Sequence, residues 1–292
     1  MPLWTTEAPD VDLVVNVAQI PQRSPFRYPG GKTWLVPHLR KWLNSLPAKP
    51  KRFIEPFGGG GIISLTVAFE NLADEVIMVE LDQDVASLWQ TMLSDECEWL
   101  AEKVTNFDVS PESVRAELAV KPVDRKHQAF QTLLRNRTSH GGILAPGSGV
   151  LKNGENGKGI SSRWYAQTLA KRIRNIQYVR EKITFIEGDG FEIIRQYAAD
   201  KTAAFFVDPP YTAGRNGKRA GTRLYTHNEL DHEELFSHAG KISGDLLMTY
   251  DNADEVIQMA TRNGLSTQTI SMKNTHHATM KELIIGHNLA WA

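Results

Sequence analysis

The stretch "RFIEPFGGGGIISLTVAFENL", residues 52–72, combines three patterns that together indicate a fold class. Its first six residues have the composition of a short buried strand, four glycines at positions 58–61 interrupt it, and apolar residues then recur at helical spacing. Glycines without a Cβ let the backbone approach a nucleotide closely at the carboxyl end of a strand. The stretch predicts a strand, a glycine turn and a helix, with Glu55 beside the turn.

A second pair of strand and helix follows. "DEVIMVEL" (residues 74–81) predicts a strand that ends at Glu80, and "DVASLWQTML" (residues 84–93) has helical spacing. Glu80 lies twenty-two residues after Gly58, close to the spacing at which an acid accepts hydrogen bonds from ribose hydroxyls. An adenosine-containing cofactor fits this spacing, and an ordinary exposed strand end is the alternative.

The alternation of strands and helices stops near residue 94 and resumes at residue 183. The intervening segment is helical and basic: residues 115–182 contain fourteen basic and four acidic residues, a net charge of +10, against -11 for the rest of the chain. Such asymmetry indicates a nucleic-acid partner, with a solvated helical face as the alternative. Within it, residues 139–162 are rich in glycine and polar residues, and we expect a surface loop or one that orders on binding.

The resumed pattern consists of "ITFIEGDGFEIIRQY", "AAFFVDPPY", "DLLMTYDNADEVIQMA", "LSTQTISM" and "KELIIGH". Short apolar strands that alternate with helices predict an α/β fold: a mostly parallel sheet with helices on both faces. The basic segment is therefore expected to be an insertion into one sheet. The 292 residues, 41% of them hydrophobic, suffice for this core.

Composition also limits the setting in which the protein works. Cys97 is the only cysteine, which excludes an intrachain disulfide and a Cys-based zinc site and suits a reducing cytoplasm. The first twenty residues have no basic residue before their apolar run, and no stretch is long and apolar enough to span a membrane. We expect a cytoplasmic protein without a membrane or metal requirement.

The string "DPPY", residues 208–211, directly follows the apolar run "AAFFV". Prolines lack a backbone N–H and hold the chain extended, so acceptors dominate this predicted strand end. An exocyclic amino group fits: the Asp208 carboxylate and the Pro209 carbonyl would take its two hydrogens, and the Tyr211 ring would stack on the base. Drawing both hydrogens out of the ring plane localises the lone pair of an adenine N6. The alternative is a Pro-Pro turn capped by a packed tyrosine.

The turn "FRYPGGKTW", residues 26–34, ends like a triphosphate-binding loop but has Phe26 where that template requires glycine. A plain Pro-Gly turn before a helix is the other interpretation.

Together, "RYPGGK", "EPFGGGG", "MVELDQD", "EGDGF" and "DPPY", in this order, resemble the Dam-type, D12-class DNA N6-adenine methyltransferases. The resemblance implies a Rossmann-like class I methyltransferase fold, with S-adenosylmethionine as cofactor and a flipped adenine in duplex DNA as substrate. It also implies a catalytic domain of residues 23–94 and 183–292, a target-recognition insertion of residues 95–182, and an N-terminal extension of residues 1–22.

The resemblance assigns roles to individual residues. Lys32 would lie near the methionine carboxylate of the cofactor, Glu80 at its ribose, with Asp82 or Asp84 as alternatives. The other expected cofactor contacts are Tyr28, Glu55, Phe57, Gly58, Gly60, Asp189, Phe191 and Asp208. The catalytic strand end would be Asp208, Pro209, Pro210 and Tyr211. The expected DNA contacts, to bases or phosphates, are Arg27, Arg135, Asn136, Arg137, Arg215, Lys218 and Arg219.

Other functions stay open at this point. Cytosine N4 in DNA or adenine in RNA would also offer an amino group, and a nucleic-acid-binding module with a decayed cofactor site is a rival of another class. A dinucleotide-dependent dehydrogenase would explain neither "DPPY" nor the basic insertion. The recognised sequence, with GATC in doubt, the oligomeric state and a restriction-linked, phage-borne or housekeeping role are not determined.

Overall fold

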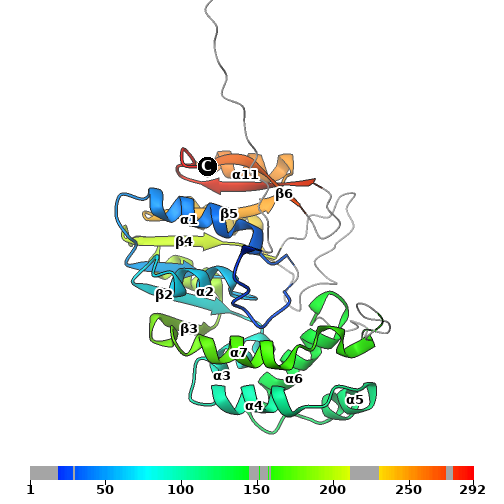
Figure 1. Cartoon of the computed structure of the whole chain (residues 1–292). Coiled ribbons are helices and arrows are strands. Elements are labelled where there is room, and N and C mark those ends of the chain that lie inside the picture. The colour runs from blue at the N-terminus through cyan, green and yellow to red at the C-terminus, as the bar shows by residue number, and fades with distance from the viewer. Residues whose placement is uncertain are drawn as a thin grey trace, which may run out of the picture.

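The computed structural model describes residues 19–28, 30–144, 151, 157, 159–210, 230–273 and 279–292. These residues form one seven-stranded sheet with the strand order β3-β2-β1-β4-β5-β7-β6 (Figure 1). The strands are β1 (Arg52–Glu55), β2 (Glu75–Glu80), β3 (Ile183–Glu187), β4 (Ala203–Val207), β5 (Asp245–Asp251), β6 (Ser266–Lys273) and β7 (Thr279–Gly286). Strands β1 to β5 are parallel, and β7 is antiparallel to both of its neighbours.

The order in which the chain adds strands reverses at β1, which pairs with β2 on one side and with β4 on the other. In an open α/β sheet, such a reversal of strand order leaves a crevice at the carboxyl ends of the strands. The sheet is doubly wound and Rossmann-like, and the crevice lies where Glu55, Glu80 and Asp208 follow or end their strands.

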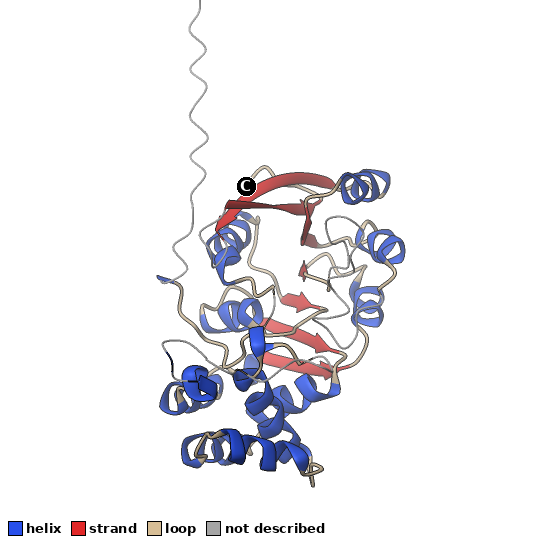
Figure 2. Cartoon of the chain, turned by 90° about the vertical axis from the view of Figure 1, so that its right-hand side faces the viewer, coloured by secondary structure: helices blue, strands red, loops and turns tan. Residues whose placement is uncertain are grey.

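Helices cover both faces of the sheet (Figure 2). One face carries α1 (Val36–Ser45), α2 (Ile62–Phe69) and α3 (Gln83–Met92), and the other carries α8 (Gly190–Tyr197), α10 (His232–Ala239) and α11 (Asp254–Arg262). Because side chains alternate along a strand, the neighbours Phe53 and Ile54 belong to the two different cores. The predicted fold class is confirmed, although the sequence analysis did not predict α10 or the direction of β7, and gave the helix after the turn of residues 26–34 only as an alternative.

Four further helices lie between α3 and β3, beyond the β3 edge of the sheet in Figure 1. They are α4 (Cys97–Asn106), α5 (Pro111–Ala119), α6 (Arg125–Thr138) and α7 (Ala166–Ile176). The buried side chains of Leu133 in α6 and Ile173 in α7 belong to the same apolar cluster as Phe53 in β1. This helical layer therefore shares its core with the sheet.

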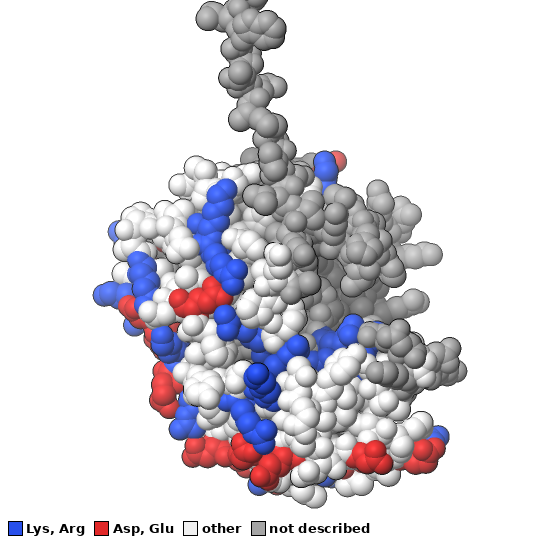
Figure 3. Space-filling view, in the orientation of Figure 1, with Lys and Arg blue, Asp and Glu red and all other residues white. Residues whose placement is uncertain are grey.

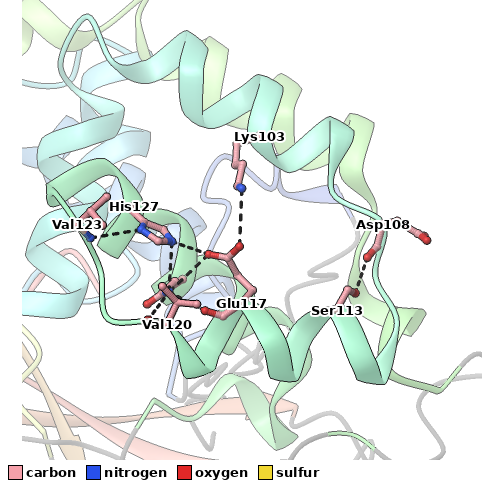
Figure 4. A network of polar contacts seen from close by, with 8 residues as sticks. Lys103, Asp108, Ser113, Glu117, Val120, Val123 and His127 are labelled. Atoms are coloured by element: carbon pink, nitrogen blue, oxygen red, sulfur yellow. Dashed lines mark hydrogen bonds and ion pairs between the residues drawn. The ribbon is translucent and has the colours of Figure 1, made fainter.

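A polar network ties three of these helices together (Figure 4). Glu117 of α5 contacts Nε2 of His127 at 2.6 Å and Nζ of Lys103 at 3.7 Å, which link it to α6 and α4. The side-chain amide of Gln131 donates to the carbonyl oxygens of Glu117 at 2.7 Å and Val120 at 2.9 Å. These contacts fix the outer end of the helical layer.

Candidate active site

A cavity of about 1250 Å³ opens at the carboxyl ends of β1, β2 and β4. The described residues that the sequence analysis assigned to cofactor or catalysis all line it: Tyr28, Lys32, Glu55, Phe57, Gly58, Gly60, Glu80, Asp189, Phe191, Asp208, Pro209 and Pro210. They come from segments up to 182 residues apart in sequence. The fold thus brings together residues that the sequence analysis connected only by pattern.

The glycine turn after β1 is shaped by its protein neighbours. A Cβ on Gly60 would lie 2.8 Å from Cβ of Tyr28, and Gly61 has a positive φ of 62° with the Trp89 ring 2.4 Å from any added Cβ. The indole Nε1 of Trp89 donates to the carbonyl oxygen of Gly59 at 2.9 Å. Tyr28 and Trp89 therefore require glycine here, in addition to any requirement that a ligand imposes.

Glu80 ends β2 beside this turn. Its Oε2 accepts from the backbone N–H of Gly59 and its Oε1 from that of Asp82, both at 2.9 Å. Burial raises the pKa of the Glu80 carboxyl to about 7. The backbone N–H of Leu81 also donates to this carboxyl. A carboxylate has about four acceptor positions, so one remains for a hydroxyl donor on a ligand. Of the two alternatives, Asp82 caps α3, and Asp84 pairs with Arg135.

Glu55 ends β1 below the cavity and is 4% exposed. Its Oε2 accepts from the backbone N–H of Ser64 at 2.9 Å and also from the Ser64 hydroxyl. Burial raises the pKa of the Glu55 carboxyl to about 8, so it binds a proton near neutral pH. This contact anchors the end of β1 to α2.

Aromatic rings form another wall. The rings of Phe57 and Phe191 meet edge to face, with centroids 6.3 Å apart at an angle of 87°. The side chain of Asp189 accepts from the backbone N–H of Phe191 at 2.9 Å and so caps α8. The cap fixes where the Phe191 ring stands in the cavity wall.

Asp208 follows β4 directly. Its Oδ1 accepts from the hydroxyl of Thr249 at 2.8 Å, and Nζ of Lys32 lies 3.0 Å from the same oxygen. Two donors on one oxygen fix the rotation of the carboxylate. The side chain of Asp208 is 20% exposed, so it faces the cavity from a recessed position.

Lys32 makes three polar contacts from one buried ammonium group. Besides Asp208, Nζ lies 3.1 Å from Oε1 of Glu282 and donates to the carbonyl oxygen of Gly30 at 3.2 Å. Burial alone would lower the pKa of Lys32, but the two carboxylates raise it above its ordinary value, so the group is charged.

The contact of Lys32 with a cofactor carboxylate stays a prediction, because Lys32 also lines the cavity. The carboxylates that contact Lys32 are those of Asp208 and Glu282, because the turn before η2 (Thr33–Leu35) directs the side chain toward the ends of β4 and β7. The sequence analysis missed Glu282, since "KELIIGH" has no pattern beyond that of a strand.

A family model described as the D12 class of N6 adenine-specific DNA methyltransferases matches residues 28–257. The chain belongs to this family. It is an adenine-specific DNA methyltransferase, and the resemblance of its motifs to that family is confirmed.

Solved methyltransferase structures match the chain at low identity and with TM-scores below 0.5. The rRNA methyltransferase aviRa from Streptomyces viridochromogenes matches with a TM-score of 0.41 and 13% identity over 93% of this chain and 92% of its own. Precorrin-6y C5,15-methyltransferase from Geobacter metallireducens GS-15 matches with a TM-score of 0.38 and 9% identity over 95% of each chain. A search of curated proteins finds no match. These similarities bear on neither substrate nor mechanism.

Two residues that were expected to contact DNA, Arg135 and Asn136, make contacts within the methyltransferase. Nη1 of Arg135 lies 2.9 Å from Oδ2 of Asp84, an ion pair between α6 and α3. Asn136 is fully buried, and its side chain accepts from the Arg27 N–H at 2.8 Å and donates to the carbonyl oxygens of Arg27 at 2.9 Å and Gly142 at 2.7 Å. The expected base contact of Asn136 is corrected, since this amide holds the Arg27 backbone.

Arg137 lies in a group of four of the five arginines that line the cavity: Arg27, Arg137, Arg163 and Arg172, with Arg195 on α8 as the fifth. Burial, together with repulsion from Arg172, Arg27 and Arg163, lowers the pKa of Arg137 to about 9. Its guanidinium donates to the carbonyl oxygen of Pro25. The sequence analysis did not single out Arg163 and Arg172 within the basic segment, although Arg172 follows buried Leu169 by three residues and so shares its side of α7.

Acidic residues just before the basic segment neutralise part of its charge. Ion pairs join Arg125 to Glu96, Arg174 to Glu98 and Arg180 to Asp95. The charge of +10 counted from sequence therefore overstates the positive field. Figure 3 shows Lys and Arg side chains gathered between the sheet and the helical layer, and acidic side chains along the lower edge.

Four of the expected site residues, Tyr211, Arg215, Lys218 and Arg219, lie outside the described residues. Among the helices that are described, none has the length and apolar composition needed to cross a membrane.

Proposed function

We propose that this methyltransferase takes its methyl group from S-adenosylmethionine and transfers it to N6 of an adenine extruded from duplex DNA. The observation that carries the proposal is that one cavity is lined by the acceptor end of β4, by the glycine turn with Glu80, and by arginines of the helical layer. A methyl acceptor, a nucleoside cofactor and a phosphate backbone each find suitable chemistry there.

The cavity residues fit the cofactor. Glu80 has an acceptor position for a ribose hydroxyl, Phe57 and Phe191 offer apolar ring surface to an adenine, and the glycine turn presents backbone without side chains. S-adenosylmethionine would supply an electrophilic methyl group on its sulfonium. Tyr28, Gly58 and Gly60 would surround the methionine end, and Asp189 would remain the cap that orients Phe191.

The acceptor end of β4 suits an exocyclic amino group. Asp208 would accept one N6 hydrogen, and the Pro209 carbonyl the other, because Pro209 and Pro210 contribute no backbone donor. Lys32 and Thr249 hold the Asp208 carboxylate in one rotation, so the amino group meets an acceptor that is already oriented. Asp208 would also accept the proton that N6 loses after the transfer.

Extrusion of the base follows from the recessed position of Asp208. A base stacked in a duplex cannot bring its N6 to a side chain that is 20% exposed at the bottom of a cavity. The four arginines would hold the phosphates beside the extruded nucleotide, since guanidinium groups match phosphate geometry. Residues 95–182 would then act as the target-recognition part of the protein.

A competition assay tests the proposal. The protein is incubated with S-adenosylmethionine and a mixture of adenine-containing duplex DNA and structured RNA, and the nucleosides are quantified by mass spectrometry. We expect N6-methyladenine in the DNA fraction. N4-methylcytosine, or methylation confined to RNA, would contradict the proposed substrate.

A further inference from the structure

Glu282 lies on β7, outside residues 28–257 that the family model matches. Its side chain is 7% exposed, and Oε1 lies 3.1 Å from Nζ of Lys32. Carboxylates at this depth are rare, because taking the charge out of water is costly unless a partner compensates. Here the partner is also in contact with the acidic residue of the catalytic strand end.

Strand register explains why Glu282 reaches this point. Val207 of β4 is paired with Met248 of β5, which places Asp208 beside Thr249. Glu282 of β7 is paired with Asp251 of β5. Three neighbouring strands therefore bring the three side chains of Asp208, Thr249 and Glu282 to the same edge, and the turn before η2 adds Lys32.

The charged groups at this edge indicate how Glu282 affects Asp208. The carboxyl of Asp251 also lines the cavity, and burial raises its pKa while Lys32 lowers it. Without Glu282, the ammonium of Lys32 would pair more strongly with the carboxylate of Asp208. A carboxylate that is tightly paired with a cation is a weaker acceptor for a neutral amino group. Because Glu282 also pairs with the ammonium of Lys32, the ion pair between Lys32 and Asp208 is weaker, and Nζ is held from a second side.

We infer that Glu282 is a positioning residue for methyl transfer: it holds Lys32 so that Asp208 keeps its orientation and its acceptor strength toward the substrate amino group. The inference rests on the proposed function. Glu282 forms and breaks no covalent bond, and the contact through which it acts is its ion pair with Lys32.

The first test is the variant Glu282→Gln, which keeps the shape of the side chain and removes its charge. We expect kcat to fall about tenfold, while KM for DNA and for S-adenosylmethionine stays within about twofold, because the lost interaction acts on the transfer step. Glu70→Gln is the matched control, since Glu70 is a partly buried glutamate paired with Arg23 and Arg40 away from the cavity. Its kcat should equal that of the wild type.

The second test asks whether Glu282 acts through Lys32. In the background of Lys32→Met, Glu282→Gln should change kcat by less than about twofold, because residues that act as one unit are not additive. A role that is only structural would lower the melting temperature and leave this non-additivity absent.

Unchanged kcat in folded Glu282→Gln overturns the inference, and so does a loss that multiplies with the loss caused by Lys32→Met. Should Glu282→Gln fail to fold, Glu282→Asp takes its place: a drop in kcat that disappears in the Lys32→Met background supports the inference, and an unchanged kcat overturns it. A wild-type protein that methylates no DNA would instead refute the proposed function.

Discussion

Nζ of Lys32 and Oδ1 of Asp208 lie 3.0 Å apart, although 176 residues separate them in sequence. This ion pair joins the N-terminal turn to the end of β4. It makes Lys32 part of the edge at which the methyl acceptor is proposed to bind, and we propose that the ammonium acts there on Asp208 and not on a cofactor carboxylate.

We therefore expect Lys32→Met to reduce kcat by roughly a hundredfold and to change the dissociation constant of S-adenosylmethionine by less than about threefold. Single-turnover rates and calorimetry with the cofactor measure the two effects separately. A thermal melt is needed beside them, because removing one partner of a buried ion pair is destabilising. A large loss of cofactor affinity with an unchanged transfer rate would instead indicate that Lys32 contacts the methionine carboxylate.

The buried carboxyl of Glu55 predicts a pH-dependent stability. Its pKa rises from 4.5 to about 8 on folding, so between these values the folded protein keeps a proton that the unfolded chain releases. The free energy of unfolding should therefore fall as the pH rises from about 4.5 to 8, by at most about 5 kcal/mol. Below pH 4.5 the group contributes nothing to this dependence.

Urea unfolding of Glu55→Gln at pH 5.5 and pH 8 checks this origin. The variant should lose less stability between the two pH values than the wild type does, whereas Glu75→Gln, a half-exposed carboxyl on β2, should follow the wild type. Equal slopes for Glu55→Gln and the wild type would show that Glu55 is not the group responsible.

The arginines of the cavity should determine DNA affinity. We expect Arg172→Ala to raise KM for DNA about tenfold and to reduce the slope of log affinity against log salt by about one, with cofactor binding unchanged. Arg174→Ala is the matched control on the same helix, because Arg174 pairs with Glu98 and does not line the cavity. If Arg172→Ala and Arg174→Ala raised KM for DNA equally, the arginines of the cavity would contribute no more to DNA affinity than an arginine outside it.

Asn136 should be a residue of stability. Asn136→Ala removes three hydrogen bonds to the backbone of Arg27 and Gly142 and leaves buried polar groups without this partner, at a cost of roughly 3 kcal/mol or more. Chemical denaturation measures the cost, and Asn263→Ala, which removes one bond to Met259 at the end of α11, should cost less. If Asn136→Ala kept the full stability of the wild type and changed the base preference, the outcome would instead support a base contact by Asn136.

The sequence predicted the parts of the protein that local pattern determines. Apolar strands followed by a distinctive turn, the glycines of residues 52–61 and the Asp-Pro-Pro of residues 203–210, predicted both the sheet and the residues that line its crevice. The helix α10 and the antiparallel direction of β7 were missed, because the apolar spacing of α10 is ordinary and strand direction depends on tertiary pairing.

Side-chain partners were the harder part of the site. Counting charges between residues 115 and 182 left out Asp84 and Glu98, which lie just before that window and pair with arginines inside it. Likewise, nothing near Lys32 in sequence indicates that Glu282 is its neighbour. Such contacts depend on strand register and on how the helical layer packs, which the local sequence does not encode.

The most direct measurement is made in a host that lacks adenine methylation. The wild-type protein and Asp208→Ala are expressed there at equal levels, and modified adenines are mapped by long-read sequencing. We expect N6-methyladenine in one consistent sequence context with the wild type and none with Asp208→Ala. Equal methylation by the variant, or unmodified DNA despite folded wild-type protein, would contradict methyl transfer to N6 of adenine at the Asp208 strand end.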